Sequence, residues 1–298
     1  MKLTPFKDNL CSRYAEKMIS IKVNNRCNCA CSFCVDRGGY NAGETDVQKI
    51  VEKAIELSDY KTVIITGGEP FLDFDKVVEI LARLRPYKTR LVLNTNGTLL
   101  TKSHVELLNN LLDELQISIH HWRENVNEKV FGKHQDLLAI KEALNIPRRF
   151  SVSINSTFNK FTVPSERKVF VSKMIDLCNI LGADRLRLTE LKKVDGEEFV
   201  SANDFFEDNS PVLSRSSNEL ITQGCTYYYS QNGVEVSVKR LCAFAKGKNA
   251  PAFSCCFINN EGQKKIDVDT EDTFKVIYSD GTTTNDWIFK GIKQTTRL

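Results

Sequence analysis

Strand-like and helix-like segments alternate along the first two thirds of the chain, and this alternation constrains the fold more than any other feature. β-Prone runs are expected at 18–23, 62–66, 91–93, 115–119, 150–154 and 185–188. Apolar residues recur at helical spacing between them, as at 75–84, 102–112, 136–144 and 165–181. Such alternation indicates parallel strands joined by right-handed crossovers. Six units are fewer than the eight of a closed barrel, so we predict an α/β fold with a partial (β/α)6 TIM-like barrel.

Capping signals predict where two of the helices begin or end. Thr45 and Gln48 have the T-x-x-Q spacing of a capping box, so the first crossover helix is expected to start there. Gly182 follows the helix expected at 165–181 and is predicted to end it as a C′ residue.

The pattern changes after about residue 190. Three turn sequences that lie between β-prone runs are typical of hairpins: QNG at 231–233, NEG at 260–262 and SDG at 279–281. We therefore predict a smaller β-rich C-terminal unit. The expected division is an N-terminal segment at 1–17, the barrel at 18–194 and a cap over its open end at 195–298.

Composition narrows the class of protein. Ten cysteines in 298 residues are too few for a small disulfide-stapled secreted chain. The N-terminus lacks the apolar stretch of a secretory signal, and no run of about 18 apolar residues predicts a membrane span. We expect a cytoplasmic protein whose clustered thiols stay reduced. The net charge of +3, from 41 basic and 38 acidic residues, argues against nucleic acid as a partner.

A cysteine-rich loop follows the first predicted strand. Cys27, Cys31 and Cys34 have the spacing C-x3-C-x2-C, with Phe33 just before the last cysteine. Three thiolates on one loop can hold three irons of a [4Fe-4S] cluster and leave the fourth iron open for chemistry. Two alternatives are a zinc site with Cys29 as the fourth ligand and free structural thiols.

A second motif, Gly67-Gly68-Glu69-Pro70, follows the second predicted strand. The glycines leave backbone amide and carbonyl groups accessible to a ligand, and Glu69 adds a carboxylate acceptor. Alone, the motif is equally compatible with a strand-to-helix turn. In a parallel sheet, however, the loops after the first two strands lie side by side at one rim.

With both motifs in this order, the sequence resembles the radical S-adenosylmethionine (radical SAM) superfamily over about residues 18 to 190. The resemblance implies that S-adenosylmethionine (SAM) chelates the open iron through its methionine group. It also implies that the reduced cluster cleaves SAM to methionine and a 5′-deoxyadenosyl radical, which abstracts hydrogen from a substrate. The chain is thus expected to be a radical SAM enzyme, with its class as oxidoreductase, lyase or isomerase left open.

The resemblance also suggests cofactor contacts. Gly67, Gly68 and Glu69 would bind the methionine amino group, and Phe33 would approach the adenine. Three residues further along the chain are candidates for contact with the methionine carboxylate or the ribose: Thr95 of a T-N-G element, Ser118 and Asn155. His120 departs from the family pattern, because an aspartate is common at its position. For the later candidates, a polar residue at a turn or strand end is an equal alternative.

The remaining cysteines are divided by position. Cys225 and Cys242 bracket the QNG hairpin, and Cys255 and Cys256 follow. These four resemble an auxiliary-cluster domain, but neighbouring strand residues point to opposite faces, so buried thiols are the alternative to a second iron–sulfur cluster. Cys178 is expected in the core. For His121, Trp122 and His134, which follow the fourth predicted strand, a surface or packing role is favoured over contact with the substrate.

The sequence leaves the substrate open. We favour a peptide that the enzyme matures, and a small electron donor such as a flavodoxin or ferredoxin as a partner. Alternatives within the superfamily are a nucleotide or small-molecule cyclase and an alcohol dehydrogenase. An alternative of another class is a module that binds a metal or cluster without catalysis.

Overall fold

A computed structural model describes residues 17–31, 33–34, 43–158, 167–190, 221–223, 226–239, 257–258, 264–265 and 274–285. Within these residues, no helix has the length and apolar character needed to cross a membrane.

An eleven-stranded sheet forms the body of the protein, in the order β13-β12-β1-β2-β3-β4-β5-β6-β9-β8-β7. The strands that alternate with helices are β1 (Met18–Lys22), β2 (Thr62–Thr66), β3 (Arg90–Thr95), β4 (Glu114–Ser118), β5 (Ser151–Phe158) and β6 (Arg185–Glu190). Each of these strands pairs in parallel with the next. The predicted partial α/β barrel is therefore confirmed.

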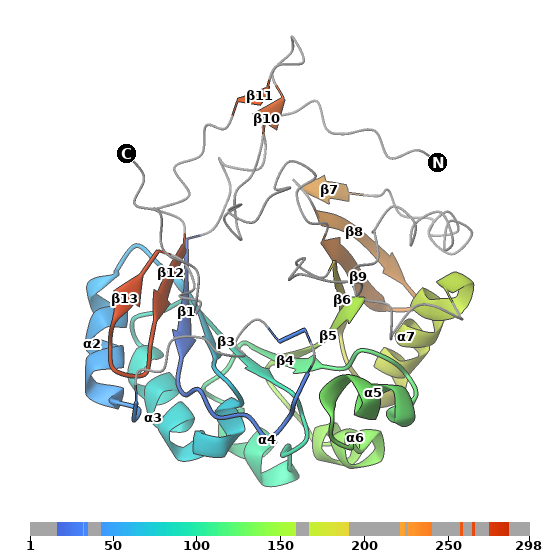
Figure 1. The fold of residues 1–298 in the computed structure, drawn as a ribbon, viewed down its shortest axis with the longest axis horizontal. Coiled ribbons are helices and arrows are strands. Elements are labelled where there is room, and N and C mark those ends of the chain that lie inside the picture. The colour runs from blue at the N-terminus through green and yellow to red at the C-terminus, as the bar shows by residue number, and fades with distance from the viewer. Residues whose placement is uncertain are drawn as a thin grey trace.

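The helices cover the outer, convex face of the curved sheet (Figure 1). They are α2 (Val47–Glu56), η1 (Pro70–Asp73), α3 (Phe74–Leu84), α4 (Lys102–Leu108), α5 (Glu124–Phe131), α6 (Leu137–Leu144) and α7 (Arg167–Leu181). Their buried apolar side chains pack against alternate strand residues such as Ile65, Leu93 and Ile117. The main hydrophobic core thus lies between the helices and the outer face of the sheet.

The opposite, inner face of the sheet is polar. Side chains alternate between the two faces of a strand, so the residues that lie between the core residues of β4, β5 and β6 face the concave side. They include Glu114, Gln116, Ser153, Asn155 and Arg187. Glu114, Gln116 and Ser153 are nevertheless buried. A polar face of this kind is suited to hold a polar ligand rather than to pack a second core.

Strands from the C-terminal third add to both edges of the barrel sheet. Next to β6 lie β9 (Val234–Lys239), β8 (Thr226–Gln231) and β7 (Ile221–Gln223), and next to β1 lie β12 (Phe274–Ile277) and β13 (Thr283–Thr284). Both β9 and β12 run parallel to the barrel strand that they join. A separate two-stranded sheet contains β10 (Phe257–Ile258) and β11 (Lys264–Lys265).

Two of the predicted hairpin turns are confirmed. In the QNG turn, Asn232 and Gly233 have φ values of 51° and 79°, which suit a two-residue turn between the antiparallel β8 and β9. The SDG turn joins the antiparallel β12 and β13. The NEG turn at 260–262 and the predicted N-terminal segment up to residue 16 lie outside the described residues. The predicted division into a barrel and a C-terminal cap stays a prediction.

Helix boundaries correct one prediction and confirm another. Asp46, not Thr45, caps α2, because its carboxylate accepts a hydrogen bond from the Lys49 amide at 3.0 Å. The Thr45 hydroxyl instead donates to the Val23 carbonyl at 2.7 Å, which ties the start of α2 to the end of β1. Gly182 follows α7 with a φ of 65°, as predicted for a left-handed C′ residue.

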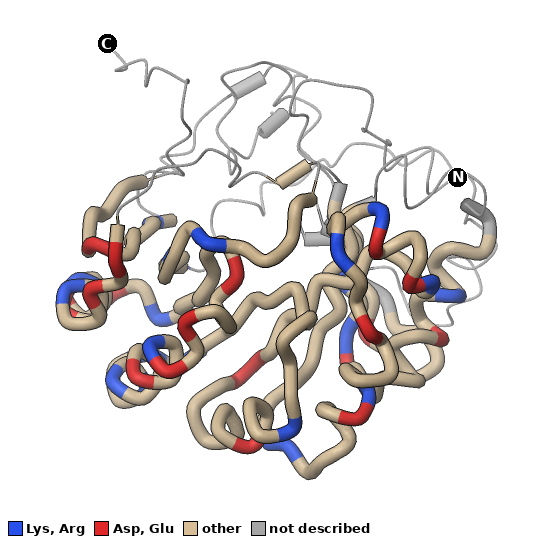
Figure 2. The backbone as a smooth tube through the Cα atoms, turned by 60° about the horizontal axis from the view of Figure 1, so that its bottom comes forward, with Lys and Arg blue, Asp and Glu red and all other residues tan. Residues whose placement is uncertain are grey.

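Basic and acidic residues are interspersed along the described helices and strands (Figure 2). Several pair within one helix, as Lys53 and Glu56 do in α2 at 2.7 Å. This distribution agrees with the small net charge of +3.

Candidate active site

The cysteine loop and the Gly-Gly-Glu-Pro motif are joined by backbone hydrogen bonds. The pairing of β1 with β2 continues beyond the strands, since the Val23 amide donates to the Thr66 carbonyl at 2.9 Å. Next, the Gly68 amide donates to the Asn24 carbonyl at 2.9 Å. The Glu69 amide then donates to the carbonyl of Arg26, the residue before Cys27, at 2.7 Å. The two motifs thus form one continuous structure at the carboxyl ends of neighbouring strands.

Glycine is required where these two segments touch. A Cβ atom on Gly68 would lie 2.1 Å from the Arg26 carbonyl oxygen, and one on Gly67 would lie 2.8 Å from that of Asn24. Both distances are too short for a real side chain, so a larger residue would force the segments apart. The glycine pair therefore serves the approach of the cysteine loop to the end of β2.

Side chains strengthen the same junction. Asn24 donates through Nδ2 to the Glu69 carbonyl at 3.1 Å and to Asp73 Oδ2 at 2.7 Å. Arg26 donates through Nη2 to Asp73 Oδ1 at 2.6 Å. The carboxylate of Asp73, at the end of η1, therefore holds both residues that lead into the cysteine loop.

The end of β3 holds the loop from a second direction. Asn96 donates through Nδ2 to Asn28 Oδ1 at 2.8 Å and approaches Cys27 Sγ at 4.0 Å. Asn28 in turn donates to the Thr98 hydroxyl at 2.8 Å. The Asn96 carbonyl accepts from Gln135 Nε2 at 2.6 Å, and the same nitrogen donates to the Ser118 carbonyl at 2.8 Å. Asn96 thus links the cysteine loop to the ends of β3 and β4.

A third attachment comes from the end of α5. The Ala30 amide donates to the Phe131 carbonyl at 2.6 Å. Gly132, which follows, lies so close that a Cβ atom there would be 3.2 Å from the Ala30 Cβ. The loop that carries Cys27 and Cys31 is therefore held at several points along its length.

Glu69 is a buried acceptor between the ends of β2 and β3. Its side chain accepts from the Phe71 amide at 3.1 Å, the Thr95 hydroxyl at 2.6 Å and the Asn96 amide at 2.7 Å. Burial raises the pKa of Glu69 to about 7, although these hydrogen bonds oppose the shift. A cation placed beside this carboxyl group would favour its ionised form.

The other predicted cofactor contacts lie at the ends of β4 and β5. Ser118 and Asn155 are paired in register on these strands. The ring of Phe33 meets the ring of His120, two residues after Ser118, edge-on at 5.3 Å between centroids. His120 Nδ1 accepts from the Thr157 amide at 3.0 Å, and burial lowers the pKa of His120 to about 4, so this imidazole is neutral at pH 7. The structure thus brings the predicted residues to one rim.

The family model of the radical SAM superfamily matches residues 21–159, which contain both motifs. The chain belongs to the radical SAM superfamily. It is accordingly an enzyme of the radical SAM class, a class whose members bind a [4Fe-4S] cluster and SAM.

Relatives with curated names are GTP 3′,8-cyclases. The chain is 37% identical over 105 residues to a probable GTP 3′,8-cyclase of Pyrococcus abyssi, a stretch that covers 34% of each chain. It is 26% identical over 283 residues to the probable GTP 3′,8-cyclase of Thermoplasma volcanium, covering 87% of this chain and 83% of the other. The match to the Pyrococcus protein therefore spans about a third of that relative.

Among solved structures, SuiB of Streptococcus suis has a similar fold. The TM-score is 0.66 at 18% identity, covering 94% of this chain and 62% of SuiB. The same protein bound to S-adenosylmethionine gives a TM-score of 0.65, also at 18% identity, and covers 93% of this chain and 62% of SuiB. At this identity the likeness shows the radical SAM fold alone.

The thiols of this radical SAM chain fit a [4Fe-4S] cluster by their chemistry and by the anchoring of their loop. None of the described cysteines is in a disulfide, and three thiols can bind three irons and leave one open. Among the described His, Cys, Asp and Glu side chains, no group of three is close enough to hold a single metal ion. Hydrogen bonding to Cys27 and burial raise the pKa of the Cys29 thiol.

The other residues that were singled out in the sequence differ in burial. Cys178 is fully buried in the core, as expected. His121 is buried and stacks on Trp122 at 3.8 Å between ring centroids, whereas His134 is exposed beside Glu128. The four cysteines predicted for an auxiliary cluster all lie outside the described residues: Cys225, Cys242, Cys255 and Cys256.

The contacts that fasten the loop could not be predicted from the sequence. Asn24, Arg26 and Asp73 stand next to recognised motifs and Asn96 lies within the T-N-G element, but their contacts join positions 45 to 69 residues apart. The charged residues on the inner face of the sheet were also not predicted. Their signal was present as alternation within the strands, as in Arg185-Leu-Arg-Leu, where every second residue is polar.

Proposed function

We propose that this enzyme reductively cleaves SAM and uses the 5′-deoxyadenosyl radical to abstract hydrogen from a peptide substrate. One observation carries the proposal for the cofactor chemistry: backbone hydrogen bonds from Gly68 and Glu69 fasten the cysteine loop to the end of β2. They fix the motif proposed to bind SAM beside the loop proposed to bind the cluster.

Each residue in the proposed site has a defined task. Cys27, Cys31 and Cys34 hold the [4Fe-4S] cluster, which when bound supplies the electron for SAM cleavage. Glu69 accepts hydrogen bonds from the methionine ammonium, together with backbone groups of Gly67 and Gly68. Phe33, beside His120, lies against the adenine.

The polar residues near the ends of β3, β4 and β5 position the rest of SAM. Thr95, Ser118 and Asn155 are proposed to contact the ribose and the methionine carboxylate. Gln135 supports this group, because it donates to the Asn96 and Ser118 carbonyls. A small electron donor such as a flavodoxin or ferredoxin supplies the reducing electron.

The inner face of the sheet supports a peptide as the substrate. Asn94 Oδ1 is buried on this face without a hydrogen-bond partner among the described residues, so it can accept a hydrogen bond from a peptide N–H group. The same fold occurs in SuiB, which has been solved with its precursor peptide SuiA bound. That likeness concerns the fold, whereas the side chains on the inner face are this chain's own.

A second candidate is cyclisation of a nucleotide. It is favoured by the match to the probable GTP 3′,8-cyclase of Thermoplasma volcanium, which extends over 283 residues. The electron donor and the SAM chemistry would be the same, so the two candidates first differ in the molecule that gives up the abstracted hydrogen.

The cofactor chemistry is tested by anaerobic reconstitution, reduction with dithionite and measurement of 5′-deoxyadenosine by mass spectrometry. We expect release by the wild-type enzyme and loss of at least a hundredfold in Cys31→Ala. Cys29→Ala is the matched control, because it removes a thiol from the same loop and should retain both iron and release. Loss of release in Cys29→Ala together with retention in Cys31→Ala would overturn the assignment of ligands.

Isotope transfer distinguishes the two substrates. The reduced enzyme is given a peptide fraction from cells grown on perdeuterated amino acids or, separately, GTP deuterated in its ribose. Deuterium in 5′-deoxyadenosine from the peptide fraction alone is the expected result. Deuterium from GTP alone would replace the peptide proposal by the cyclase.

A further inference from the structure

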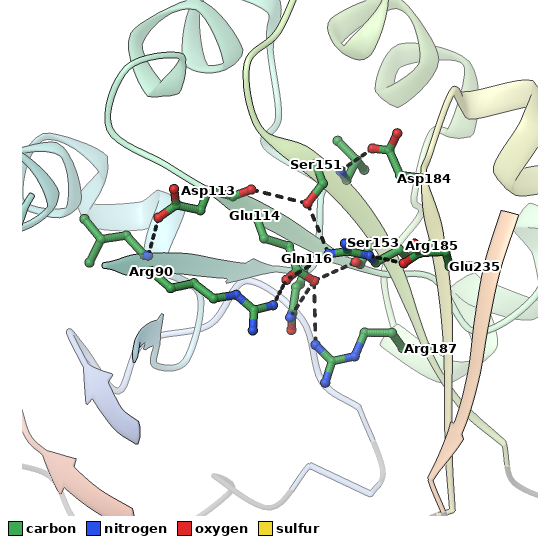
Figure 3. Close-up of polar contacts among 12 residues, drawn as sticks. Arg90, Asp113, Glu114, Gln116, Ser151, Ser153, Asp184, Arg185, Arg187 and Glu235 are labelled. Atoms are coloured by element: carbon green, nitrogen blue, oxygen red, sulfur yellow. Dashed lines mark hydrogen bonds and ion pairs between the residues drawn. The ribbon is translucent and has the colours of Figure 1, made fainter. Parts of the chain in front are cut away.

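A line of hydrogen bonds crosses the polar inner face of the sheet from β4 to β5. Figure 3 shows its first part, in which Gln116 Nε2 donates to Glu114 Oε1 at 2.9 Å. Asn155 of β5 donates in turn through Nδ2 to Gln116 Oε1 at 3.0 Å. The line therefore joins three side chains in the order Glu114, Gln116, Asn155.

The carboxylate of Glu114 anchors this line. Its side chain is 2% exposed, and Arg90 pairs with its Oε2 atom. The Ser153 hydroxyl donates to its Oε1 atom at 2.6 Å. Burial alone would raise the pKa of Glu114, but Ser153, Arg187 and the other partners outweigh it and lower the pKa. Glu114 is thus ionised at neutral pH, and an ionised carboxylate only accepts hydrogen bonds.

An anchor that only accepts sets the orientation of both amides. Each side-chain amide has a donating NH2 group and an accepting oxygen. Gln116 must therefore turn its NH2 group toward Glu114 and its oxygen toward β5. Asn155 must then turn its NH2 group toward Gln116. Donors and acceptors are thus fixed in order from the carboxylate to Asn155.

This order leaves an acceptor at the end of the line. Among the described residues, Asn155 Oδ1 is buried without a hydrogen-bond partner. Asn155 is half-buried, and it faces the inner side of the sheet because the preceding residue, Ile154, packs in the core. Buried acceptors are stabilised by donors. Asn155 Oδ1 therefore suits a ligand that brings an O–H or N–H group to the inner face.

The strands place this acceptor near the proposed adenine contact. Phe33, which is proposed to lie against the adenine, meets His120, and His120 Nδ1 accepts from the Thr157 amide at 3.0 Å. Asn155 is two residues before Thr157 on β5, which is about 7 Å along a strand. The ribose is bonded directly to the adenine. A ribose hydroxyl can therefore reach Asn155 when the adenine lies against Phe33.

The methionine carboxylate of SAM is a poorer partner for Asn155. A carboxylate only accepts, so it cannot donate to an amide oxygen. The methionine group is also proposed to bind at Glu69, which is hydrogen-bonded to Thr95 and Asn96 near the end of β3. Because β4 lies between β3 and β5, about 10 Å separates those two strands. A ribose hydroxyl thus suits Asn155 in both chemistry and position.

We propose that Glu114 and Gln116 are positioning residues that hold Asn155 as an acceptor for a ribose hydroxyl of SAM. The inference rests on the proposed SAM site, and it decides between the two SAM groups considered for Asn155. If the line only joined β4 to β5, breaking it would lower stability but would not change the choice between SAM analogues.

Binding to the reconstituted enzyme tests the proposal, with the cluster left oxidised so that SAM stays intact. Anaerobic equilibrium dialysis gives the affinities for SAM and for two analogues in which fluorine replaces the 2′ or the 3′ hydroxyl. Fluorine is close to a hydroxyl in size but has no proton to donate. We expect the wild-type enzyme to bind one analogue at least tenfold more weakly than SAM, because Asn155 Oδ1 would lose its donor. Asn155→Ala should bring this ratio close to one.

Two variants break the line without changing Asn155. Gln116→Met keeps the length of the side chain and removes its amide, whereas Glu114→Gln keeps the shape and removes the anchor that only accepts. Each should let the Asn155 amide rotate and lower the ratio at least threefold. Gln48→Met is the matched control, since Gln48 is exposed on the outer helix α2 and its variant should keep the wild-type ratio.

Each part of the proposal has a result that would overturn it. A wild-type ratio in a folded Gln116→Met or Glu114→Gln variant would overturn the positioning role. Equal binding of SAM and both analogues by the wild type, or a wild-type ratio in Asn155→Ala, would overturn the contact even if the other variants failed to fold. Release of 5′-deoxyadenosine is measured on the same wild-type sample after reduction. Release without discrimination rejects the ribose contact alone, whereas no release rejects the proposed function.

Discussion

Gly68 lies so close to the cysteine loop that a single methyl group should separate the two motifs. In Gly68→Ala, the new Cβ would meet the Arg26 carbonyl, which already accepts a hydrogen bond from the Glu69 amide. We expect a loss of about 1–3 kcal/mol in the free energy of unfolding, as for overpacked sites. We also expect at least a tenfold weaker SAM affinity, measured by anaerobic equilibrium dialysis of the reconstituted enzyme.

Gly233→Ala separates this effect from the general cost of replacing glycine. Gly233 has a φ of 79° in the β8–β9 turn, and a Cβ atom there would meet nothing within 4 Å. The variant should lose about 1 kcal/mol in stability through backbone strain and retain its SAM affinity. Wild-type SAM affinity in Gly68→Ala would contradict the role given to the junction.

Local spacing is enough to predict the motifs but not the contacts that fasten them. Cys27, Cys31 and Cys34 lie within eight residues of one another, so their common loop follows from the sequence. The Arg26–Asp73 pair joins residues 47 positions apart. Each partner alone is an ordinary charged residue beside a turn, and only the pairing of β1 with β2 makes them neighbours.

At the scale of elements, a buried lysine stabilises the end of α2. Lys88 is 3% exposed, and its Nζ donates to the Leu57 carbonyl at 2.7 Å and the Tyr60 carbonyl at 2.8 Å. Burial, with a smaller effect of Lys61, lowers the pKa of Lys88 from 10.5 to about 8. Between these pH values the unfolded chain binds more protons than the folded one, so stability should rise with pH.

Lys88→Met should remove this pH dependence. The free energy of unfolding of the thiol-reduced chain is measured in urea at pH 8 and pH 10.5. We expect the difference between wild type and Lys88→Met to grow by about 1–3 kcal/mol in favour of the wild type across this range. Lys53→Met, an exposed change on α2, should show no such growth. A constant or shrinking difference for Lys88→Met would show that Lys88 remains protonated in the fold.

Helices with regularly spaced apolar residues could be predicted from the sequence, whereas a helix without this spacing was missed. The helix expected at 75–84 is α3, because Val77, Ile80, Leu81 and Leu84 all face the core. Helix α5 was missed, since its sequence ENVNEKVF buries only Asn127, Val130 and Phe131. The first helix was assigned the wrong cap because the hydroxyl of Thr45 has a partner from β1, which local sequence does not reveal.

At the scale of the whole molecule, the C-terminal third supplies strands to both edges of the barrel sheet. From sequence, turn signals such as Asn232-Gly233 predicted the hairpins, but not the parallel pairing of β9 with β6 or of β12 with β1. Parallel pairing joins distant segments and has no local turn as a signal. One consequence is that Glu235 from the C-terminal third reaches Arg185 of the barrel.

Measuring the iron and sulfide content of the protein shows how many clusters it carries. We expect a variant with Cys27, Cys31 and Cys34 all replaced by Ala to lose about four irons and four sulfides per chain after anaerobic reconstitution, because three thiolates of one loop hold one [4Fe-4S] cluster. The buried Cys178 and the loop residue Cys29 serve as controls, since replacing either by Ala should remove no iron.

The iron that remains in the triple variant tests the predicted auxiliary cluster. A remainder of about four irons, lost when Cys225 and Cys242 are also replaced, would establish a second cluster in the C-terminal third. A remainder near zero would reject it and leave those cysteines as thiols. Loss of less than one iron in the triple variant would instead contradict the assignment of the first cluster, because the three cysteines would then not be its ligands.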